Sequence, residues 1–357
     1  MPTKREISLR RLETVRARLA SLSANALYAT PSSNLYYLTG IDFHRSERLT
    51  ALLLFQDQEP VVICPAFEAA RLKTMSAVER VVTWEETEDP FAKAAALFPA
   101  SAGTLAVEPS TAYEDVERLL LARSGWRAAS AATLFSTLRM VKTPEEIALM
   151  RQAIAVAVPR FRKAFEALKP GCLESDISAM FGGENVVQFG PSSALPHGAS
   201  GPTPLQPDQA VLIDAWDKPD GYYYDITRST FFGTPSDEYR KIWSIVLDAQ
   251  SAAIEKAAPG VPCSEVDAAA RRVIERAGYG EQFTHRLGHG LGIDVHEPPY
   301  MVGHDRTVLE PGMTFTSEPG IYLLGRFGVR IEDDVVCTER GAESLSPRVA
   351  RLEPIPS

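Results

Sequence analysis

The sequence lacks long apolar runs and paired cysteine motifs. No stretch approaches the ~18–20 apolar residues of a membrane-spanning helix, and the charged start MPTKREISLRRLETVRARLA has no apolar core of a secretory signal. The cysteines lie far apart and form no CxxC motif, which is typical of reduced thiols rather than of a disulfide framework or a zinc site. We therefore expect a cytoplasmic protein.

Positive charge is also scarce. Lys and Arg number 37 against 46 Asp and Glu, which gives a net charge of −9 and a pI near 5.3. This balance argues against a nucleic-acid or anionic-membrane partner. The length of 357 residues, with 45% hydrophobic and 23% charged, predicts an ordinary globular protein of two domains.

The first 137 residues alternate apolar runs with helical patterns, which predicts an α/β domain. No Gly-rich phosphate loop and no obvious catalytic constellation occur there. The expected strands are Ala26–Thr30, Thr50–Phe55, Val61–Cys64, Val78–Trp84 and Thr104–Val107. The expected helices are Glu6–Ser21, Phe67–Thr74, Pro90–Leu97 and Ala112–Arg123.

A new unit begins at LRMVKTPEEIALM. Thr143 is a suitable N-cap, and Glu146 completes a capping box, so a helix is expected from there to about Leu168. We place the domain boundary just before this helix, which gives domains 1–137 and 138–357. The second domain mixes strands with pairs of helices and is predicted to be α+β, with helices on one face of a sheet. Its first strand, ENVVQFGPSSALPHG, is expected to end near His197, and its next helices cover 236–258 and 264–277.

The stretch VLIDAWDKPDGYYYDITRS reads as two strands joined by a tight turn. The first strand ends on Asp214, and the second reaches Asp225. A carboxylate at the end of an apolar strand is costly to bury alone. A hairpin that brings two of them together predicts a cation between them.

More candidate ligands follow this hairpin. His285, His289 and His296 lie within twelve residues, and Glu318 and Glu332 are expected on the last two strands. Taken singly, each carboxylate is more commonly a solvated surface residue, and the histidines could equally well belong to a solvated glycine-rich turn. We interpret the neighbouring Asp333 and Asp334 as surface charges. Taken together, four carboxylates and one imidazole suit hard or borderline divalent cations. Two such ions close together are a common device for activating water in hydrolysis.

The motifs DAWDKPDGYYYDITRS, HRLGHGLGIDVHEPP, SEPGIYL and GVRIEDDVV resemble those of the pita-bread metallopeptidases. They are most similar to the Xaa-Pro branch, prolidase (Xaa-Pro dipeptidase) and aminopeptidase P. The resemblance covers nearly the whole chain. It implies a creatinase/prolidase N-terminal α/β domain, which would contribute to dimerisation and to the substrate cleft, and a pita-bread α+β catalytic domain.

The resemblance also implies roles for single residues. The metal ligands would be Asp214, Asp225, His289, Glu318 and Glu332. Glu318 would also take the proton of the attacking water, and His296 would hydrogen-bond the tetrahedral oxyanion. His197 and His285 would lie near the substrate, and Arg330 would support the site electrostatically.

Two positions depart from the family pattern. Trp216 stands two residues after the first metal aspartate, where the family usually has glycine. Tyr300 stands where some prolidases carry an arginine that holds the substrate carboxylate. The replacement cation would be Arg45, Arg48 or Arg306, unless these are ordinary surface arginines.

The resemblance therefore implies dinuclear hydrolysis of the Xaa-Pro bond, most simply in dipeptides, by a homodimer. Manganese is the favoured metal, and zinc and cobalt also suit the ligands. A pocket for the proline ring would have candidate walls at Phe189, Tyr222, Tyr223 and Tyr300, or these would pack in the core. The alternatives are aminopeptidase P activity on longer peptides, a metal-free hydrolase such as creatinase, and a catalytically inactive binding module.

Overall fold

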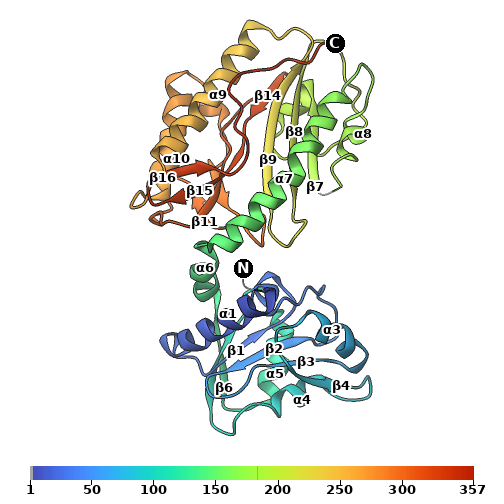
Figure 1. The fold of residues 1–357 in the computed structure, drawn as a ribbon, viewed down its shortest axis with the longest axis vertical. Coiled ribbons are helices and arrows are strands. Elements are labelled where there is room, and N and C mark those ends of the chain that lie inside the picture. Colours follow the sequence, from blue (N-terminus) through green and yellow to red (C-terminus); the bar gives the residue numbers. More distant parts are fainter. Residues whose placement is uncertain (1–2, 183) are drawn as a thin grey trace. The chain divides into compact units, whose positions relative to one another are not determined.

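The computed structural model describes residues 3–182 and 184–357, in two compact units, Met1–Leu138 and Arg139–Ser357 (Figure 1). The division falls inside helix α6 (Ala132–Met140). In the described ranges, no helix is both long enough and apolar enough to cross a membrane.

The first unit is built on a mixed sheet of strand order β4-β3-β2-β1-β5-β6. Strand β1 pairs antiparallel with β2 and parallel with β5, which is the α/β arrangement expected from the sequence. Its core includes edge-to-face contacts of Phe98 with Phe55 and Trp126. The strands are β1 (Ala26–Ala29), β2 (Ala51–Phe55), β3 (Val61–Pro65), β4 (Arg80–Trp84), β5 (Gly103–Val107) and β6 (Trp126–Ser130). The helices before α6 are α1 (Lys4–Leu19), α2 (Ser33–Thr39), α3 (Ala69–Met75), α4 (Pro90–Ala95) and α5 (Tyr113–Ala122).

The second unit opens with the predicted capped helix. In α7 (Pro144–Glu166), Thr143 Oγ1 accepts the Glu146 amide at 3.3 Å, and the Glu146 carboxylate accepts the Thr143 amide at 2.8 Å. The capping box is therefore confirmed. The remaining helices are α8 (Glu174–Ser178), α9 (Asp237–Lys256) and α10 (Cys263–Arg276).

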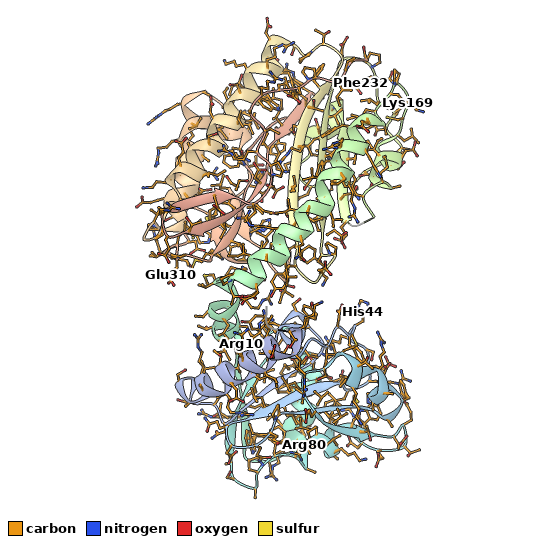
Figure 2. All side chains as sticks on the ribbon, viewed as in Figure 1. Arg10, His44, Arg80, Lys169, Phe232 and Glu310 are labelled. Carbon is orange, nitrogen blue, oxygen red and sulfur yellow. The ribbon has the colours of Figure 1, made fainter. Side chains whose placement is uncertain are left out.

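The described strands of this unit form three sheets, of strand orders β7-β8-β9, β11-β10-β12-β15-β16 and β13-β14. Helices α9 and α10 pack together against the last two sheets, in one core that includes Trp243, Val266, Phe315 and Val335. In Figure 1 helix α7 crosses strands β8 and β9. Phe232, labelled in Figure 2, marks the end of β9. The strands are β7 (Glu184–Phe189), β8 (Gln209–Asp217), β9 (Tyr224–Phe232), β10 (Gly288–Gly290), β11 (Glu297–Met301), β12 (Thr314–Ser317), β13 (Gly320–Leu323), β14 (Phe327–Arg330), β15 (Asp333–Thr338) and β16 (Gly341–Ser344).

Several predicted boundaries in this unit are wrong. Strand β7 ends at Phe189, and a 3₁₀ turn (Gly190–Ala194) follows it instead of a strand to His197. Strand β8 continues past Asp214 to Asp217. The two strands expected at the end of the chain are four, β12 to β15, and Glu318 and Glu332 lie in the short breaks between them. Pro319, which has no N–H to donate to a ladder, explains the first break.

Candidate metal centre

One face of the β7-β8-β9 sheet carries the predicted hairpin carboxylates. Residues two apart on a strand share a face, so Asp214 and Trp216 of β8 point the same way. The register pairs Asp214 with Thr227 and Trp216 with Asp225 across β8 and β9. Paired residues also share a face. The sheet therefore presents both aspartates, with Thr227, to the same side.

His289 comes from β10, where two glycines allow very close backbone packing. A Cβ on Gly288 would lie 2.0 Å from the Thr316 carbonyl oxygen, and one on Gly290 would lie 2.4 Å from that of Pro298. Any side chain at either position would force the strands apart. The glycines of the LGHGLG motif thus hold the histidine tightly between β11 and β12.

The two glutamates are held by threonine hydroxyls. Thr227 Oγ1 donates to Glu332 Oε2 at 2.6 Å, and Thr316 Oγ1 donates to Glu318 Oε1 at 3.2 Å. Because each glutamate lies in a break between strands, its orientation depends on these contacts rather than on a sheet ladder. Thr227 and Thr316 were not singled out from the sequence. Thr227 is 105 positions from Glu332, so only the fold makes these two neighbours, whereas Thr316 stands two positions before Glu318, which was the available signal.

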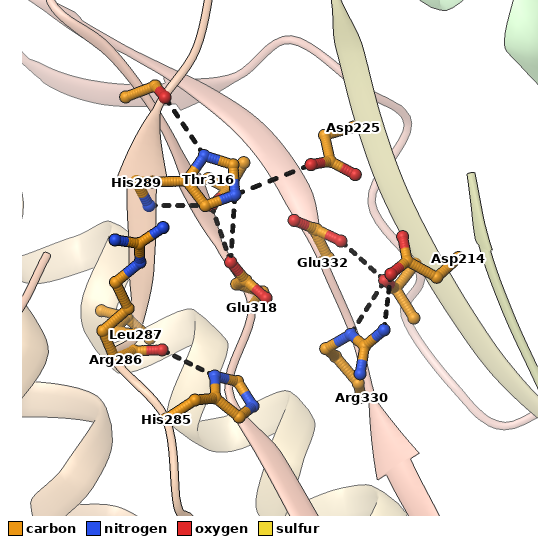
Figure 3. Close-up of polar contacts among 12 residues, drawn as sticks. Asp214, Asp225, His285, Arg286, Leu287, His289, Thr316, Glu318, Arg330 and Glu332 are labelled. Atoms are coloured by element: carbon orange, nitrogen blue, oxygen red, sulfur yellow. Dashed lines mark hydrogen bonds and ion pairs between the residues drawn. The ribbon is translucent and has the colours of Figure 1, made fainter. Parts of the chain in front are cut away.

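The five expected ligands come together. Three overlapping groups, each with donor atoms within 4.8 Å of one another, are Asp214 with Asp225 and Glu332, His289 with Glu318 and Glu332, and Asp225 with His289 and His296. Figure 3 shows Asp214, Asp225, Glu318 and Glu332 turned toward a common space beside His289. In the described chain, His289 Nε2 lies 3.6 Å from Asp225 Oδ2 and 3.3 Å from Glu318 Oε1.

The residues present fit a divalent cation. Arg330 Nη2 donates to Asp214 Oδ2 at 2.6 Å, but the buried Oδ1 atom of Asp214 has no hydrogen-bond partner among the described residues. A buried carboxylate oxygen without a donor is costly. An oxygen-binding cation would satisfy it.

The electrostatics of the cluster favour a cation as well. Burial, and next the charge of Glu332, raise the pKa of Asp225 well above its usual range. Burial, with repulsion from Glu318, does the same to the pKa of Glu332. Burial also raises the pKa of Glu318 to about 7, although Arg330 opposes the shift. Buried carboxylates take up protons in this way when no positive charge compensates them.

His289 is prepared to act as a neutral ligand. Burial, and then the neighbouring His296, lower the pKa of His289 well below its usual range, so the ring carries no charge and its contacts with Asp225 and Glu318 are not ion pairs. Its Nδ1 lies 3.1 Å from the Gly290 carbonyl oxygen, which can accept a hydrogen bond from it. That bond leaves the Nε2 lone pair directed at the carboxylates, as metal-binding histidines require.

A cavity of about 560 Å³ opens onto the cluster, and its lining includes His197, His285, His296 and Arg330. His285 Nε2 lies 2.9 Å from the Tyr322 hydroxyl, which also accepts from Arg330 Nη1 at 2.9 Å. Burial lowers the pKa of His285 to about 3. The rings of His296 and His289 pack edge to face, with 4.0 Å between centroids.

The other expected substrate contacts each have a partner within their own unit. Arg45 and Arg48 belong to the first unit, where Arg45 lies 3.9 Å from Asp115 and Arg48 binds Glu86 at 2.8 Å. Arg306 donates to Ser264 Oγ at 3.1 Å, and neither it nor Tyr300 is among the described residues that line the cavity.

The proposed proline-pocket walls are also outside this lining in the described part of the chain. Phe189 is fully buried in the core, and the Tyr222 hydroxyl donates to Glu146 Oε1 at 2.6 Å. Tyr223 lies under the Lys218 ammonium group. These contacts favour the packing role for Phe189 and Tyr222.

The burial of two residues differs from what the sequence predicts. Asp333 and Asp334 were expected on the surface, which is wrong, because both are fully buried. Arg228 holds Asp333 at 2.7 Å, and Asp334 accepts the amide of Asp225 at 3.2 Å. A carboxylate that fixes the backbone of a ligand strand is a supporting element of the site.

Arg286 was overlooked as a site residue. It lines the cavity, and its guanidinium lies over the Tyr300 ring, 4.7 Å from the centroid. The residue lies within the quoted HRLGHGLG motif, three positions before His289, so its place in the motif was the available signal.

Comparison with known proteins agrees with this geometry. The family model described as metallopeptidase family M24 matches residues 148–339, and that of the creatinase/prolidase N-terminal domain matches residues 11–141. A putative dipeptidase of Bacillus subtilis is 36% identical over 95% of this chain and 98% of its own length. The Xaa-Pro dipeptidase of Lactobacillus helveticus is 35% identical, covering 97% of this chain and 99% of the relative.

Among solved structures, the dipeptidase PepE of Mycobacterium ulcerans superposes with a TM-score of 0.92 at 34% identity, over 100% of both chains. The matches span both units, and the resemblance drawn from the sequence motifs is confirmed. The chain belongs to metallopeptidase family M24, with a creatinase/prolidase N-terminal domain ahead of a pita-bread catalytic domain.

Proposed function

We propose that the protein hydrolyses Xaa-Pro dipeptides with two divalent metal ions, most simply Mn²⁺, held by Asp214, Asp225, His289, Glu318 and Glu332. The observation that carries this proposal is the convergence of these five donors around a buried Asp214 oxygen that lacks a partner. Membership of a metallopeptidase family and the names of the relatives support the metal dependence and the substrate class.

Divalent ions at this site would activate a water molecule and polarise the scissile carbonyl group. The protein's own residues complete the reaction. Glu318, which lies in the cluster 3.3 Å from His289 Nε2, takes the proton of the attacking water and passes it to the proline nitrogen. His296, on the cavity wall, donates a hydrogen bond to the oxygen that becomes negative.

The remaining polar residues orient these groups. Arg330 holds Asp214, so one carboxylate oxygen stays free for a cation. His285 and Tyr322 hold Arg330 through the shared hydroxyl. His197 lies on the cavity wall and contacts the substrate from there.

A dipeptide needs a cation for its proline carboxylate. Arg286 is a better candidate for it than Arg306, because Arg286 lines the cavity and is held in place by the Tyr300 ring. Arg45 or Arg48 would serve instead if a homodimer brings the first unit of a partner chain to the site.

The test uses chelated protein reloaded with Mn²⁺, Co²⁺ or Zn²⁺. We expect two bound ions per chain by elemental analysis, and faster cleavage of Met-Pro than of Met-Pro-Ala. Preference for the tripeptide would support aminopeptidase P activity instead. Metal-loaded protein that cleaves neither peptide would contradict the proposal and favour an inactive binding module.

A further inference from the structure

Glu184 and Trp216 form a contact pair at the edge of the metal centre. The register of the β7-β8-β9 sheet aligns Glu184 with Trp216 and Trp216 with Asp225, so the three side chains form one row on one face. Trp216 Nε1 donates to Glu184 Oε2 at 3.0 Å, and both residues line the cavity with Asp214.

The Glu184 carboxylate differs from its acidic neighbours in having no positive partner. Arg160 holds Asp217 at 2.8 Å, Arg139 holds Asp294 at 2.7 Å and Arg330 holds Asp214. In 3–182 and 184–357, no Lys, Arg or His forms an ion pair with Glu184. The metal cluster accounts for the other carboxylates of the cavity. Glu184 is therefore an exposed carboxylate, without a positively charged partner among the described residues, at a substrate-sized cavity.

The cavity lining also contains a positive side chain, Arg286, that forms no ion pair in residues 3–182 and 184–357. Arg286 comes from the segment before β10 and lies over the Tyr300 ring, whereas Glu184 begins β7 and accepts a hydrogen bond from Trp216. Figure 3 shows Arg286 beside His289 and Glu318, across the cluster from Asp214. Outside the metal cluster, the two charged side chains of the lining that form no ion pair in the described chain, Arg286 and Glu184, therefore come from different segments of the fold.

We infer that Glu184 and Trp216 form a subsite for a cationic side chain on the residue before proline. The inference rests on the proposed function and names its preferred substrates, Lys-Pro and Arg-Pro. A carboxylate accepts the charged hydrogen bond, and an indole face attracts the cation. Residues two apart on a strand are separated by about 7 Å. A long side chain extending from the carboxylate cluster at Asp214 reaches Trp216 over that distance.

The experiment compares Lys-Pro with the uncharged Met-Pro on the Mn²⁺-loaded full-length protein. We expect kcat/KM to favour Lys-Pro by about 3- to 10-fold at low ionic strength, with the preference shrinking as salt is added. Glu184→Gln should lower this ratio by about 3- to 10-fold and leave Met-Pro turnover within about twofold of wild type.

Glu310→Gln is the matched control, because it removes one exposed carboxylate that does not line the cavity (Figure 2). It should leave the Lys-Pro to Met-Pro ratio unchanged. A second variant, Trp216→Leu, keeps an apolar side chain but removes the indole face, and it should lower the ratio as well.

The outcomes separate the two proposals. Cleavage of both dipeptides with no preference for Lys-Pro, or with a preference that Glu184→Gln leaves intact, would overturn the subsite but not the peptidase. Failure of the metal-loaded wild type to cleave any Xaa-Pro dipeptide would overturn the proposed function and the subsite together.

Discussion

Asp225 and Glu332 are carboxylates that the fold removes from water, with exposed fractions of 5% and 1%. The cluster around them holds the side chain of Arg330 but more negative groups than positive ones. Burying like charges together is unfavourable unless protons or cations neutralise them. At the scale of single residues, each ligand is therefore expected to matter for binding the ions and not for packing alone.

Asp225→Asn and Glu332→Gln should each abolish metal binding and activity together. The amide keeps the shape of the side chain but removes the charge, and we expect turnover to fall by more than about 100-fold. Elemental analysis and a dipeptide assay on the same sample measure both effects. A variant that keeps its ions and turns over at the wild-type rate would show that the residue is not a ligand.

His296→Ala should lower activity without removing the bound ions. The residue is exposed on the cavity wall, so its loss should leave the bound ions in place while kcat falls by about 10²- to 10³-fold through loss of a hydrogen bond to the oxyanion. The measurement is kcat at saturating dipeptide with metal content checked in parallel. Loss of metal in this variant would place His296 among the ligands.

Single residues were predictable where a short motif carries the chemistry. Asp214, Asp225 and His289 are recognisable from their immediate neighbours in the sequence. The burial of Asp333 and Asp334 was not, because Arg228 and the Asp225 amide reach them from β9, more than a hundred positions away along the chain. A pair of adjacent aspartates in isolation is typical of a surface.

At the scale of elements, a buried ion cluster joins the segment before α7 to the segment that carries His296. Lys142 Nζ binds Glu297 Oε1 at 2.7 Å, and Arg139 contacts both Glu297 and Asp294. The side chains of Lys142 and Glu297 are only 1% and 5% exposed. Asp294 and Glu297 flank His296 in the sequence, so the cluster anchors that segment.

Lys142→Met should lower the free energy of unfolding by roughly 3 kcal/mol, because it leaves Glu297 buried with less compensation. Arg326→Met provides the comparison. It breaks an exposed ion pair with Glu238 and should cost less than about 1 kcal/mol. Urea denaturation of the metal-free proteins measures both. Equal effects would mean that burial adds nothing to the Lys142 pair.

Elements with strong local signals were predictable, and those defined by pairing alone were not. Strand β6 was overlooked because its sequence, WRAAS, is exposed after its first residue and has no apolar alternation. The strands after Met313 ran together because the breaks at Glu318 and Glu332 span only two residues each, 318–319 and 331–332. The capped helix α7 was clear because its start has its own chemistry.

At the scale of the whole molecule, metal binding should depend on pH through these carboxyl groups. In the metal-free fold the pKa of Glu318 is about 7, against 4.5 for the ordinary group. The folded protein then holds a proton that the unfolded chain releases. This contribution to stability is complete below about 4.5 and is lost as the pH rises through about 7.

Added Mn²⁺ should therefore raise the melting temperature more at about pH 8 than at about pH 6, because protons compete with the ions at the lower pH. Thermal denaturation at a fixed free Mn²⁺ concentration, with a chelated sample at each pH, measures the difference. Glu318→Gln should reduce the difference between the two pH values in the stabilisation by Mn²⁺. If Mn²⁺ raises the melting temperature by the same amount at both pH values, Glu318 is not protonated in the metal-free protein.

The breaks at Glu318 and Glu332 have a mechanical consequence. Asp214 and Asp225 belong to one sheet, His289 to a second, and the glutamates to the joints that connect the small β13-β14 ribbon to its neighbours. Ions bound by all five side chains would cross-link three β-sheets that are not joined to one another by strand pairing. Removal of the ions by a chelator should then weaken the packing between the sheets, while the strand pairing within each sheet is retained.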